Sequence, residues 1–275
     1  MKNNKAEDKL LKMQDSVLNT IKSSRQHLLS ENNSKEYIHN IRVDIKHLRA
    51  WLRLTKRKSG GLDWKKIDRR LSDCAKELGS IRDNQVMITT LDFLYSNSKT
   101  KEDQAAIIFI KNQLACNPTK PKNIPEKLKN ELLTLLKDFE EKYTDIKSIS
   151  ELKAGFKYSI NKCEFLARNV FLNTSSNKDI HKLRKWIKNL YYQTEYISKA
   201  FHVSKKLRTR MHKLGNMLGN VHDLIIIKDR LDSLEENYFI NVACSLIDEN
   251  IALIVKSSAP VYKKLFNSPR LKSIF

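Results

Sequence analysis

Two segments of the sequence carry basic residues at spacings that place them on one face of a helix. In the first segment, residues 37–54, these residues are His39, Arg42, Lys46, Arg49 and Arg53. At 100° per residue they fall within a stripe about 80° wide. Arginine and lysine side chains present positive charge and hydrogen-bond donors, with no acceptor. Such a row therefore suits a ligand built from negatively charged acceptors, such as a chain of phosphates.

The apolar residues of this segment lie beside the basic stripe and not opposite it. They are Ile38, Ile41, Ile45, Leu48 and Leu52. A helix with this pattern buries its apolar face and brings the cations to the edge of the core. Two interpretations remain open: a ligand-binding row, or a passive face that carboxylates from other helices neutralise.

The same pattern occurs a second time. His181, Arg184 and Lys188 reproduce the spacing of His39, Arg42 and Lys46 at an offset of 181 − 39 = 142. A second block repeats at an offset of 218 − 78 = 140, with LGSIRD at residues 78–83 and LGNVHD at residues 218–223. Upstream of these blocks, Lys66 and Arg70 correspond to Lys206 and Arg210. The order of the blocks predicts two copies of one helical unit, packed around a pseudo-twofold axis so that both stripes line one channel.

Glycines interrupt both LG blocks inside otherwise strong helical patterns. Gly79 and Gly219 each cost up to about 1 kcal/mol relative to alanine in a helix, so a close helix crossing would explain them. A glycine that ends the helix is the alternative. Asp83 and Asp223 follow four residues later and are expected to hold Arg82, or a basic residue of a neighbouring helix, in place.

The composition favours an all-α protein with a polyanionic partner. Lys+Arg 52 against Asp+Glu 31 give a net charge of +21, while 40% of the residues are hydrophobic. Gly 6 and Pro 5 are few for a protein with many tight turns. Eight or nine long helices are expected, with breaks at residues 31–34, 59–61, 96–98, 116–125, 173–177 and 259–260. We predict a first repeat at 1–116, a connector with one helix at 117–146 and a second repeat at 147–275.

No membrane span, secretory signal or metal site is expected. The longest apolar runs, 224–227 and 251–255, are four and five residues long, and the N-terminus is polar. A cytoplasmic location follows as an expectation. The cysteines are widely spaced and are interpreted as buried free thiols: Cys74, Cys116, Cys163 and Cys244. The dipeptide His222-Asp223 occurs in metal-dependent phosphohydrolases, but it lacks the further ligands that such a centre needs. No cofactor is expected.

The four motifs together resemble the CHAD domain, the conserved-histidine α-helical domain. They read H-x-x-R-V-x-x-K-x-L-R from His39, L-G-x-I-R-D from Leu78, H-K-L-R-K-x-x-K-x-L from His181 and L-G-x-V-H-D from Leu218. The resemblance spans nearly the whole chain and implies a stand-alone domain of two four-helix bundles. It also implies a non-catalytic function, the binding of inorganic polyphosphate in a basic central pore. The chain departs from the family pattern at Tyr191, where a cation is usual, and at Gln85.

The residues predicted to bind polyphosphate combine the repeated motifs with flanking cations. They are His39, Arg42, Lys46, Arg49, Arg53, His181, Arg184, Lys188, Arg25, Arg168, Lys66, Arg70, Lys206 and Arg210. Six more are predicted to support them: Arg82, Asp83, His222, Asp223, Gly79 and Gly219. The two repeated histidines have a second interpretation, in which they hydrogen-bond a carbonyl or an aspartate across a helix pair and do not contact the ligand.

A helical RNA- or DNA-binding protein is the alternative function, because charge alone fits it equally well. Base recognition usually adds exposed aromatic residues for stacking. Tyr191, Tyr192 and Tyr196 lie on a segment predicted to be packed, and Trp51 and Trp186 are predicted to pack between helices. The balance of these features favours polyphosphate. A storage, granule-targeting or regulatory role is left open, as is the oligomeric state.

Overall fold

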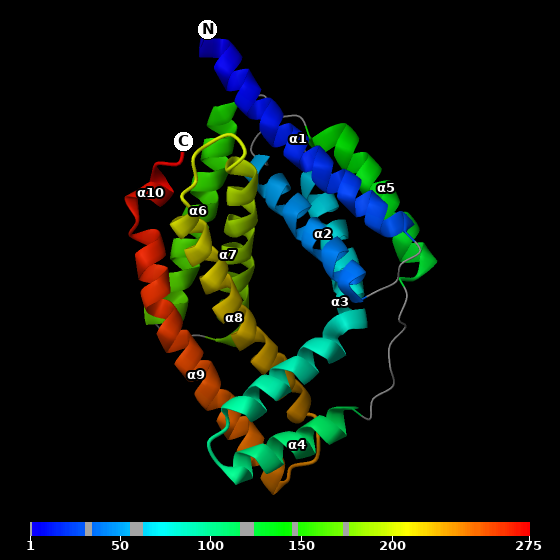
Figure 1. Ribbon diagram of the computed structural model, residues 1–275, viewed down its shortest axis with the longest axis vertical. Coiled ribbons are helices and arrows are strands. Elements are labelled where there is room, and N and C mark those ends of the chain that lie inside the picture. The colour runs from blue at the N-terminus through cyan, green and yellow to red at the C-terminus, as the bar shows by residue number, and fades with distance from the viewer. Residues whose placement is uncertain (1, 31–34, 56–62, 116–123, 145–147, 173–175) are drawn as a thin grey trace.

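The computed structural model describes residues 2–30, 35–55, 63–115, 124–144, 148–172 and 176–275, and the side chains within these ranges except at 2–5, 35, 63, 80–85, 115 and 172. Within these ranges the chain forms helices and no strand, which confirms the all-α prediction (Figure 1). The helices are α1 (Lys2–Leu29), α2 (Lys35–Thr55), α3 (Asp63–Asn97), α4 (Lys101–Ala115), α5 (Glu126–Tyr143), α6 (Ile149–Leu172), α7 (Asn177–Ile197), α8 (Lys205–Leu231), α9 (Tyr238–Phe266) and the short α10 (Pro269–Lys272).

Side-chain caps mark where three helices of the second half begin. Ser176 and Ser204 accept hydrogen bonds from the backbone N–H of Asp179 and Leu207, both at 3.3 Å. Asn237 accepts one from Ile240 at 3.0 Å. Each cap satisfies a backbone donor that the first turn leaves without a partner. The breaks predicted at 96–98 and 173–177 agree with the end of α3 and the start of α7, whereas those at 31–34 and 59–61 lie outside the described residues.

The break predicted at residues 259–260 is wrong, because α9 continues through Pro260. Proline removes one backbone hydrogen bond inside a helix and crowds the carbonyl four residues earlier. Here the helix buries side chains on both sides of the proline: Ile247 and Ser258 before it, and Leu265 and Phe266 after it. Packing of both halves against the rest of the protein outweighs the local cost.

The predicted helical periodicity is confirmed in α1 and α2, which pack against each other. Leu10, Met13, Val17, Ile21 and Leu28 of α1 are all buried, and so are the five apolar residues predicted for α2. Burial of each such side chain contributes about 1.5–3 kcal/mol relative to exposure. Burial of its apolar face fixes the rotation of α2 about its axis. The basic stripe beside that face therefore lies at the edge of the core.

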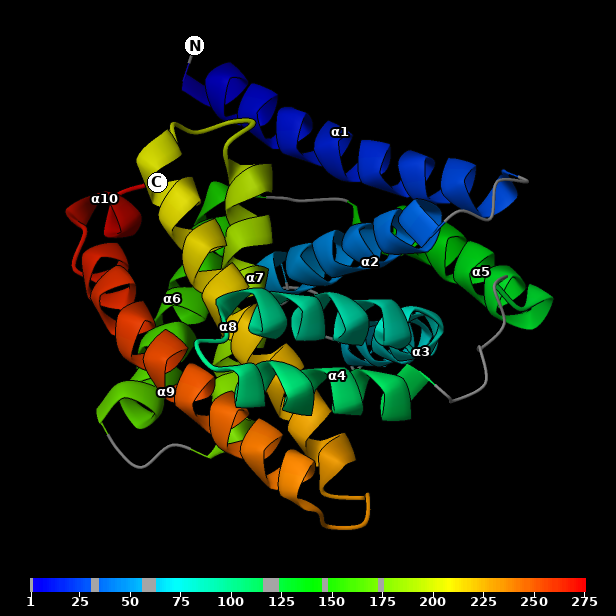
Figure 2. The same cartoon turned by 60° about the horizontal axis from the view of Figure 1, so that its bottom comes forward.

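The core divides into two apolar clusters, and α3 and α8 belong to both. Their N-terminal halves enter the larger cluster, through Leu71 and Leu78 of α3 and Met211 and Leu218 of α8. Their C-terminal halves pack with α4 and the start of α9 in the smaller cluster, through Leu91 of α3 and other residues. Figure 2 shows α4 lying beside the second half of α3 and near α9. The pseudo-twofold relation between the repeats and their boundaries stay predictions.

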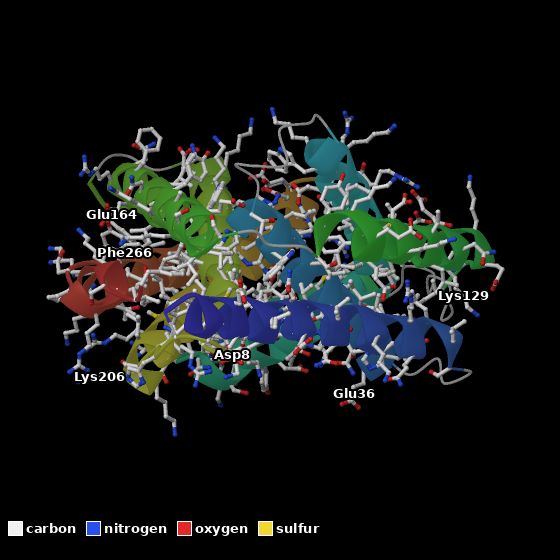
Figure 3. All side chains as sticks on the ribbon, turned by 90° about the horizontal axis from the view of Figure 1, so that it is seen from above. Asp8, Glu36, Lys129, Glu164, Lys206 and Phe266 are labelled. Atoms are coloured by element: carbon white, nitrogen blue, oxygen red, sulfur yellow. The ribbon has the colours of Figure 1, made fainter. Side chains whose placement is uncertain are left out.

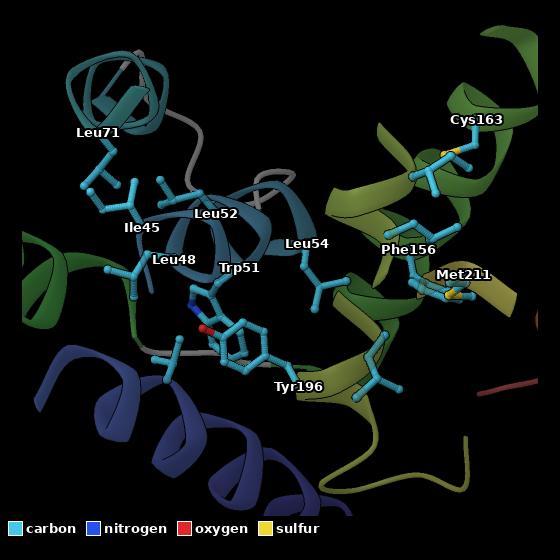
Figure 4. Close-up of a cluster of buried hydrophobic side chains, with 14 of the residues drawn as sticks. Ile45, Leu48, Trp51, Leu52, Leu54, Leu71, Phe156, Cys163, Tyr196 and Met211 are labelled. Carbon is cyan, nitrogen blue, oxygen red and sulfur yellow. The ribbon is translucent and has the colours of Figure 1, made fainter. Parts of the chain in front are cut away.

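Helix α2 connects the two halves of the chain. Trp51 is fully buried, donates a hydrogen bond from Nε1 to the backbone oxygen of Tyr143 at 2.7 Å, and meets the ring of Tyr196 edge-on at 5.1 Å (Figure 4). On α6, a Cβ atom added to Gly155 would lie 2.7 Å from the carbonyl carbon of Leu54 and closer still to its oxygen. The backbones of α2 and α6 therefore touch directly, and only glycine fits at this crossing.

Helix α9 is long and apolar enough to cross a membrane by length and composition, with a mean hydropathy of 1.5 over its best window. The run-length criterion did not detect it, because polar residues interrupt its apolar ones. In the structure α9 packs on α8, α4 and α6. The absence of membrane insertion therefore stays a prediction.

Two of the four cysteines are buried free thiols, as predicted. Cys74 and Cys163 are buried, and burial raises the pKa of Cys74 to about 12. Cys244 is also free but only half-buried, so the burial expected for it is wrong. Cys116 lies outside the described residues.

Candidate functional site

One carboxylate holds two arginines of the predicted stripe. Arg49 donates from Nε to Asp68 of α3 at 2.8 Å, and Arg53 donates from Nη2 to the same carboxylate at 3.2 Å. Burial raises the pKa of Asp68, but the hydrogen bonds and charges of the two arginines outweigh it and leave the pKa below its ordinary value. One negative charge faces two positive ones, so the passive interpretation holds only in part.

Arg53 also reaches the second repeat. Its Nη1 donates to Asn189 of α7 at 3.4 Å, and its guanidinium carbon lies 5.7 Å from the centre of the Trp186 ring. The second contact has the geometry of a cation–π interaction. The C-terminal half of the α2 stripe therefore lies against α7, the helix that carries the second stripe.

Arg42 lies over the first LG block. Its Nη1 donates to the backbone oxygen of Ala75 on α3, and a Cβ atom at Gly79 would lie 3.2 Å from its Cζ. The missing side chain at Gly79 leaves room for the guanidinium. Ala75 and Gly79 are four residues apart on one face of α3, so both small residues face the same arginine.

The second repeat shows a related arrangement between α7 and α8. A Cβ atom at Gly215 would lie 3.0 Å from Cε of Lys188, and one at Gly219 would lie 3.7 Å from Nε of Arg184. Lys188 also donates to Asn216 at 2.7 Å. Gly79 and Gly219 both lie inside helices and do not end them, so the helix-end alternative is wrong. At both glycines the nearest neighbour is a basic side chain and not a crossing backbone.

The Arg184 guanidinium is largely withdrawn from solvent. Its Nε is buried and has no hydrogen-bond partner among the described residues. Burial lowers the pKa of Arg184, and the charge of Asp223 opposes that shift. An arginine remains charged in any such environment. A buried donor without a partner is costly, and an anion on this side would satisfy it.

Lys185 joins the two stripes electrostatically. Burial lowers its pKa, and so do the positive charges of Arg49, Lys76, Arg184 and Arg53, in that order. These groups come from α2, α3 and α7. Asp68 pairs with Arg49 and Arg53, and Asp73 pairs with Lys76 at 3.1 Å. We name these five cations, together with Arg42 of α2 and Lys188 of α7, the basic seam. Its members are Arg42, Arg49, Arg53, Lys76, Arg184, Lys185 and Lys188.

A pair of histidines borders the basic seam. Nδ1 of His181 lies 3.2 Å from Nδ1 of His222, and the ring centres are 4.3 Å apart. Burial, together with the charges of Arg184 and Lys185, lowers the pKa of His181 to about 4 and that of His222 to about 3. Both rings are therefore neutral at pH 7. In the ligand-free protein His181 pairs across the α7–α8 interface with His222, and not with the carbonyl or aspartate of the second interpretation.

This pair makes stability fall on acidification. The folded-state pKa values lie below the unfolded value of about 6.5, so the unfolded chain binds more protons between pH 6.5 and pH 3. The melting temperature is therefore expected to fall through this range and to fall less in His222→Gln, which keeps a polar side chain but cannot titrate. Thermal melts of both proteins from pH 7.5 to 4 check this. Identical pH profiles would remove the histidine pair as the cause.

The flanking cations of the prediction do not all join the basic seam. Arg25 pairs with Glu140 of α5 at 2.6 Å, and Arg70 pairs with Glu131 at 3.5 Å. Lys66 and Arg168 are exposed on α3 and α6. Lys206 and Arg210 face α10 in a separate concavity of about 210 Å³. His39 and Lys46 lie half-buried on α2, and the side chains of Arg82 and Asp83 fall outside the described residues.

Sequence reasoning missed Lys185 and Lys76. Lys185 lies about 40° from His181 on a helical wheel, just outside the stripe, and its counterpart in the first copy is Val43, so a search for repeated positions passes over it. Lys76 had no such signal, because it lies on a helix outside both stripes. Asp68 was missed for the same reason.

A second concavity, of about 320 Å³, adjoins Asp223 but does not suit a polyanion. The described residues that line it are mainly apolar or hydroxyl-bearing, with one carboxylate: Val86, Thr89, Thr90, Phe93, Asn220, Asp223, Leu224 and Ile254. It has no cation among them. The basic seam, and not this larger space, therefore remains the candidate site.

No curated protein matches the chain. The family model described as the CHAD domain matches residues 15–232, which include all four motifs and every member of the basic seam. The match covers most of the 275 residues, and the chain therefore belongs to the CHAD domain family.

Proposed function

We propose that the protein binds inorganic polyphosphate along the basic seam and does no chemistry on it. The observation that carries the proposal is that the two basic stripes meet: Arg53 of α2 donates to Asn189 of α7 at 3.4 Å and lies 5.7 Å from the centre of the Trp186 ring. The positive charges of Arg49, Lys76, Arg184 and Arg53 also act on Lys185 of α7. Like charges this close repel each other, and a polyanion would relieve the repulsion. Family membership supports the same ligand class.

The basic seam suits a phosphate chain because its cations are held in place before binding. Asp68 fixes Arg49 and Arg53, the Ala75 carbonyl fixes Arg42, and Asn216 holds Lys188. Fixed donors lose less conformational freedom when a ligand binds. In this proposal the two repeats pack around a pseudo-twofold axis, and one chain of phosphates contacts both stripes in a shared channel.

Nucleic acid is the weaker candidate, because the nearby aromatic rings already have protein partners. Tyr196 and Trp51 are buried, and Trp186 contacts Arg53 and the ring of Tyr158 at 5.8 Å. Stacking of bases needs exposed rings. A cytoplasmic location and association with polyphosphate granules are part of the proposal.

Binding is expected to depend steeply on salt and to favour long polyphosphate over RNA. If about six phosphates are contacted, affinity should fall on the order of 10³-fold between about 50 and 200 mM salt, by analogy with nucleic acids. Fluorescence anisotropy with labelled long-chain polyphosphate, competed by single-stranded RNA of equal charge, measures both effects. Affinity that is insensitive to salt would contradict the electrostatic account, and stronger competition by RNA would favour the nucleic-acid alternative.

A further inference from the structure

A small concavity lies at the start of α8, where the C-terminal segment packs beside it. Its volume is about 210 Å³. The residues that line it are Ser204, Lys206, Leu207, Arg210, Ser268 and Arg270. Figure 3 shows Lys206 at the end of the molecule where α10 lies. The α8 residues that face the basic seam, Gly215 and Gly219, lie five and nine residues beyond Arg210 along the helix.

The concavity is positively charged and has no carboxylate in its lining. Arg210 donates from Nη1 to the backbone oxygen of Lys264 at 3.0 Å, which fixes its guanidinium. No ion pair joins Lys206, Arg210 or Arg270 to a carboxylate within the described ranges. Ser268 begins α10 without a side-chain capping hydrogen bond, so its hydroxyl remains available. Three cations and a hydroxyl thus converge on one small space.

At the corresponding position in the first repeat, a carboxylate neutralises the arginine. Arg70, the counterpart of Arg210, pairs with Glu131 of α5 at 3.5 Å. In the second repeat, the lining of the concavity beside Lys206 and Arg210 contains a third cation, Arg270, and no carboxylate. Ser268 and Arg270 also lie beyond residue 232, where the family match ends. The extra charge is thus a feature that the C-terminal segment adds to the repeat.

We propose that this concavity binds a phosphate dianion, either free orthophosphate or the terminal phosphate of a longer chain. Arginine forks and a lysine ammonium match the charge and the acceptor oxygens of such a group, and a serine hydroxyl donates to it. A space of about 210 Å³ has room for a phosphate group. The site is separate from the basic seam and does not depend on the function proposed for it.

The test is titration of the full chain with orthophosphate, followed by calorimetry and ³¹P NMR. Arg270→Ala and Lys206→Ala are expected to weaken orthophosphate binding on the order of tenfold each. Lys272→Ala is the matched control, because Lys272 lies on the same short helix, pairs with Glu164 at 3.6 Å and does not line the concavity. Thermal melts check that each variant folds. Absence of orthophosphate binding, or equal weakening in Lys272→Ala, would overturn the proposal.

Chains with free and with capped ends distinguish the two sources of phosphate. If the site binds chain ends, Arg270→Ala weakens binding of uncapped chains and leaves capped chains unaffected. If it binds only free orthophosphate, both chains bind the variant as they bind the natural protein. Arg184→Ala tests the basic seam in the same assays. This substitution should weaken binding of capped and uncapped chains and leave binding of orthophosphate unchanged. Failure of the proposal for the basic seam can therefore be distinguished from failure of the proposal for the concavity.

Discussion

Replacing Arg184 with alanine is expected to weaken binding of long-chain polyphosphate at least tenfold, and replacing Arg42 should have an effect of similar size. Both guanidiniums hold matching positions in the two repeats and lie over small residues of the next helix. A charge-assisted hydrogen bond to a desolvated ligand contributes about 1.5–3 kcal/mol. The measurement is polyphosphate affinity at fixed salt, with a thermal melt of each variant.

The two variants should differ in stability. Arg42→Ala loses a hydrogen bond to Ala75 inside the protein, whereas Nε of Arg184 has no partner among the described residues to lose. Lys12→Ala, on the exposed face of α1, is the control for removing one positive charge. If Arg42→Ala abolished binding while Arg184→Ala matched Lys12→Ala, the shared channel would be wrong. The site would then belong to the first repeat alone.

Gly155→Ala is expected to destabilise the fold strongly. The added Cβ atom would overlap the backbone carbonyl of Leu54, which cannot move aside as the end of a side chain can. Overpacking of a core costs about 1–3 kcal/mol and occasionally more, and here the clash is between two backbones. Denaturant unfolding measures the loss, which should exceed the gain of up to about 1 kcal/mol from better helix propensity.

Gly219→Ala is the matched control for this substitution. It makes the same change inside a helix, but its Cβ atom would meet only Nε of Arg184 at 3.7 Å, an ordinary contact. Its stability should therefore stay unchanged or rise slightly. Equal destabilisation of the two variants would show that helix propensity and not the α2–α6 contact determines the effect at Gly155.

Much of the fold could be predicted because the apolar residues that recur at helical spacing are the residues that become buried. The spacing of Leu10, Met13 and Val17 placed one face of α1 in the core, and the repeat of His39 and His181 pointed to the two helices, α2 and α7, of the candidate site. Scarce glycine and proline excluded a sheet protein. These features are local, so the sequence alone reports them.

The rest depends on contacts between helices that no local pattern reports. Asp68 neutralises part of the stripe from another helix, and His222 holds His181 in a neutral pair. Proline at 260 looked like a helix end, but the packing of Leu265 and Phe266 outweighs its local cost. The flanking cations Arg25 and Arg70 have their own carboxylates, which lie on α5, far along the chain.

The passage of α3 and α8 through both apolar clusters has a consequence for how the protein unfolds. Each of these helices packs one half in the larger cluster and the other half in the smaller cluster. If α3 or α8 unfolds, apolar surface is therefore exposed in both clusters. The unfolding of one cluster is therefore coupled to the unfolding of the other, and the two are expected to behave as one cooperative unit, even though the sequence contains a repeat. A repeat array whose units contact only their neighbours can lose them one at a time. For this chain we therefore expect a single unfolding transition, in which the helices that carry the two stripes unfold together.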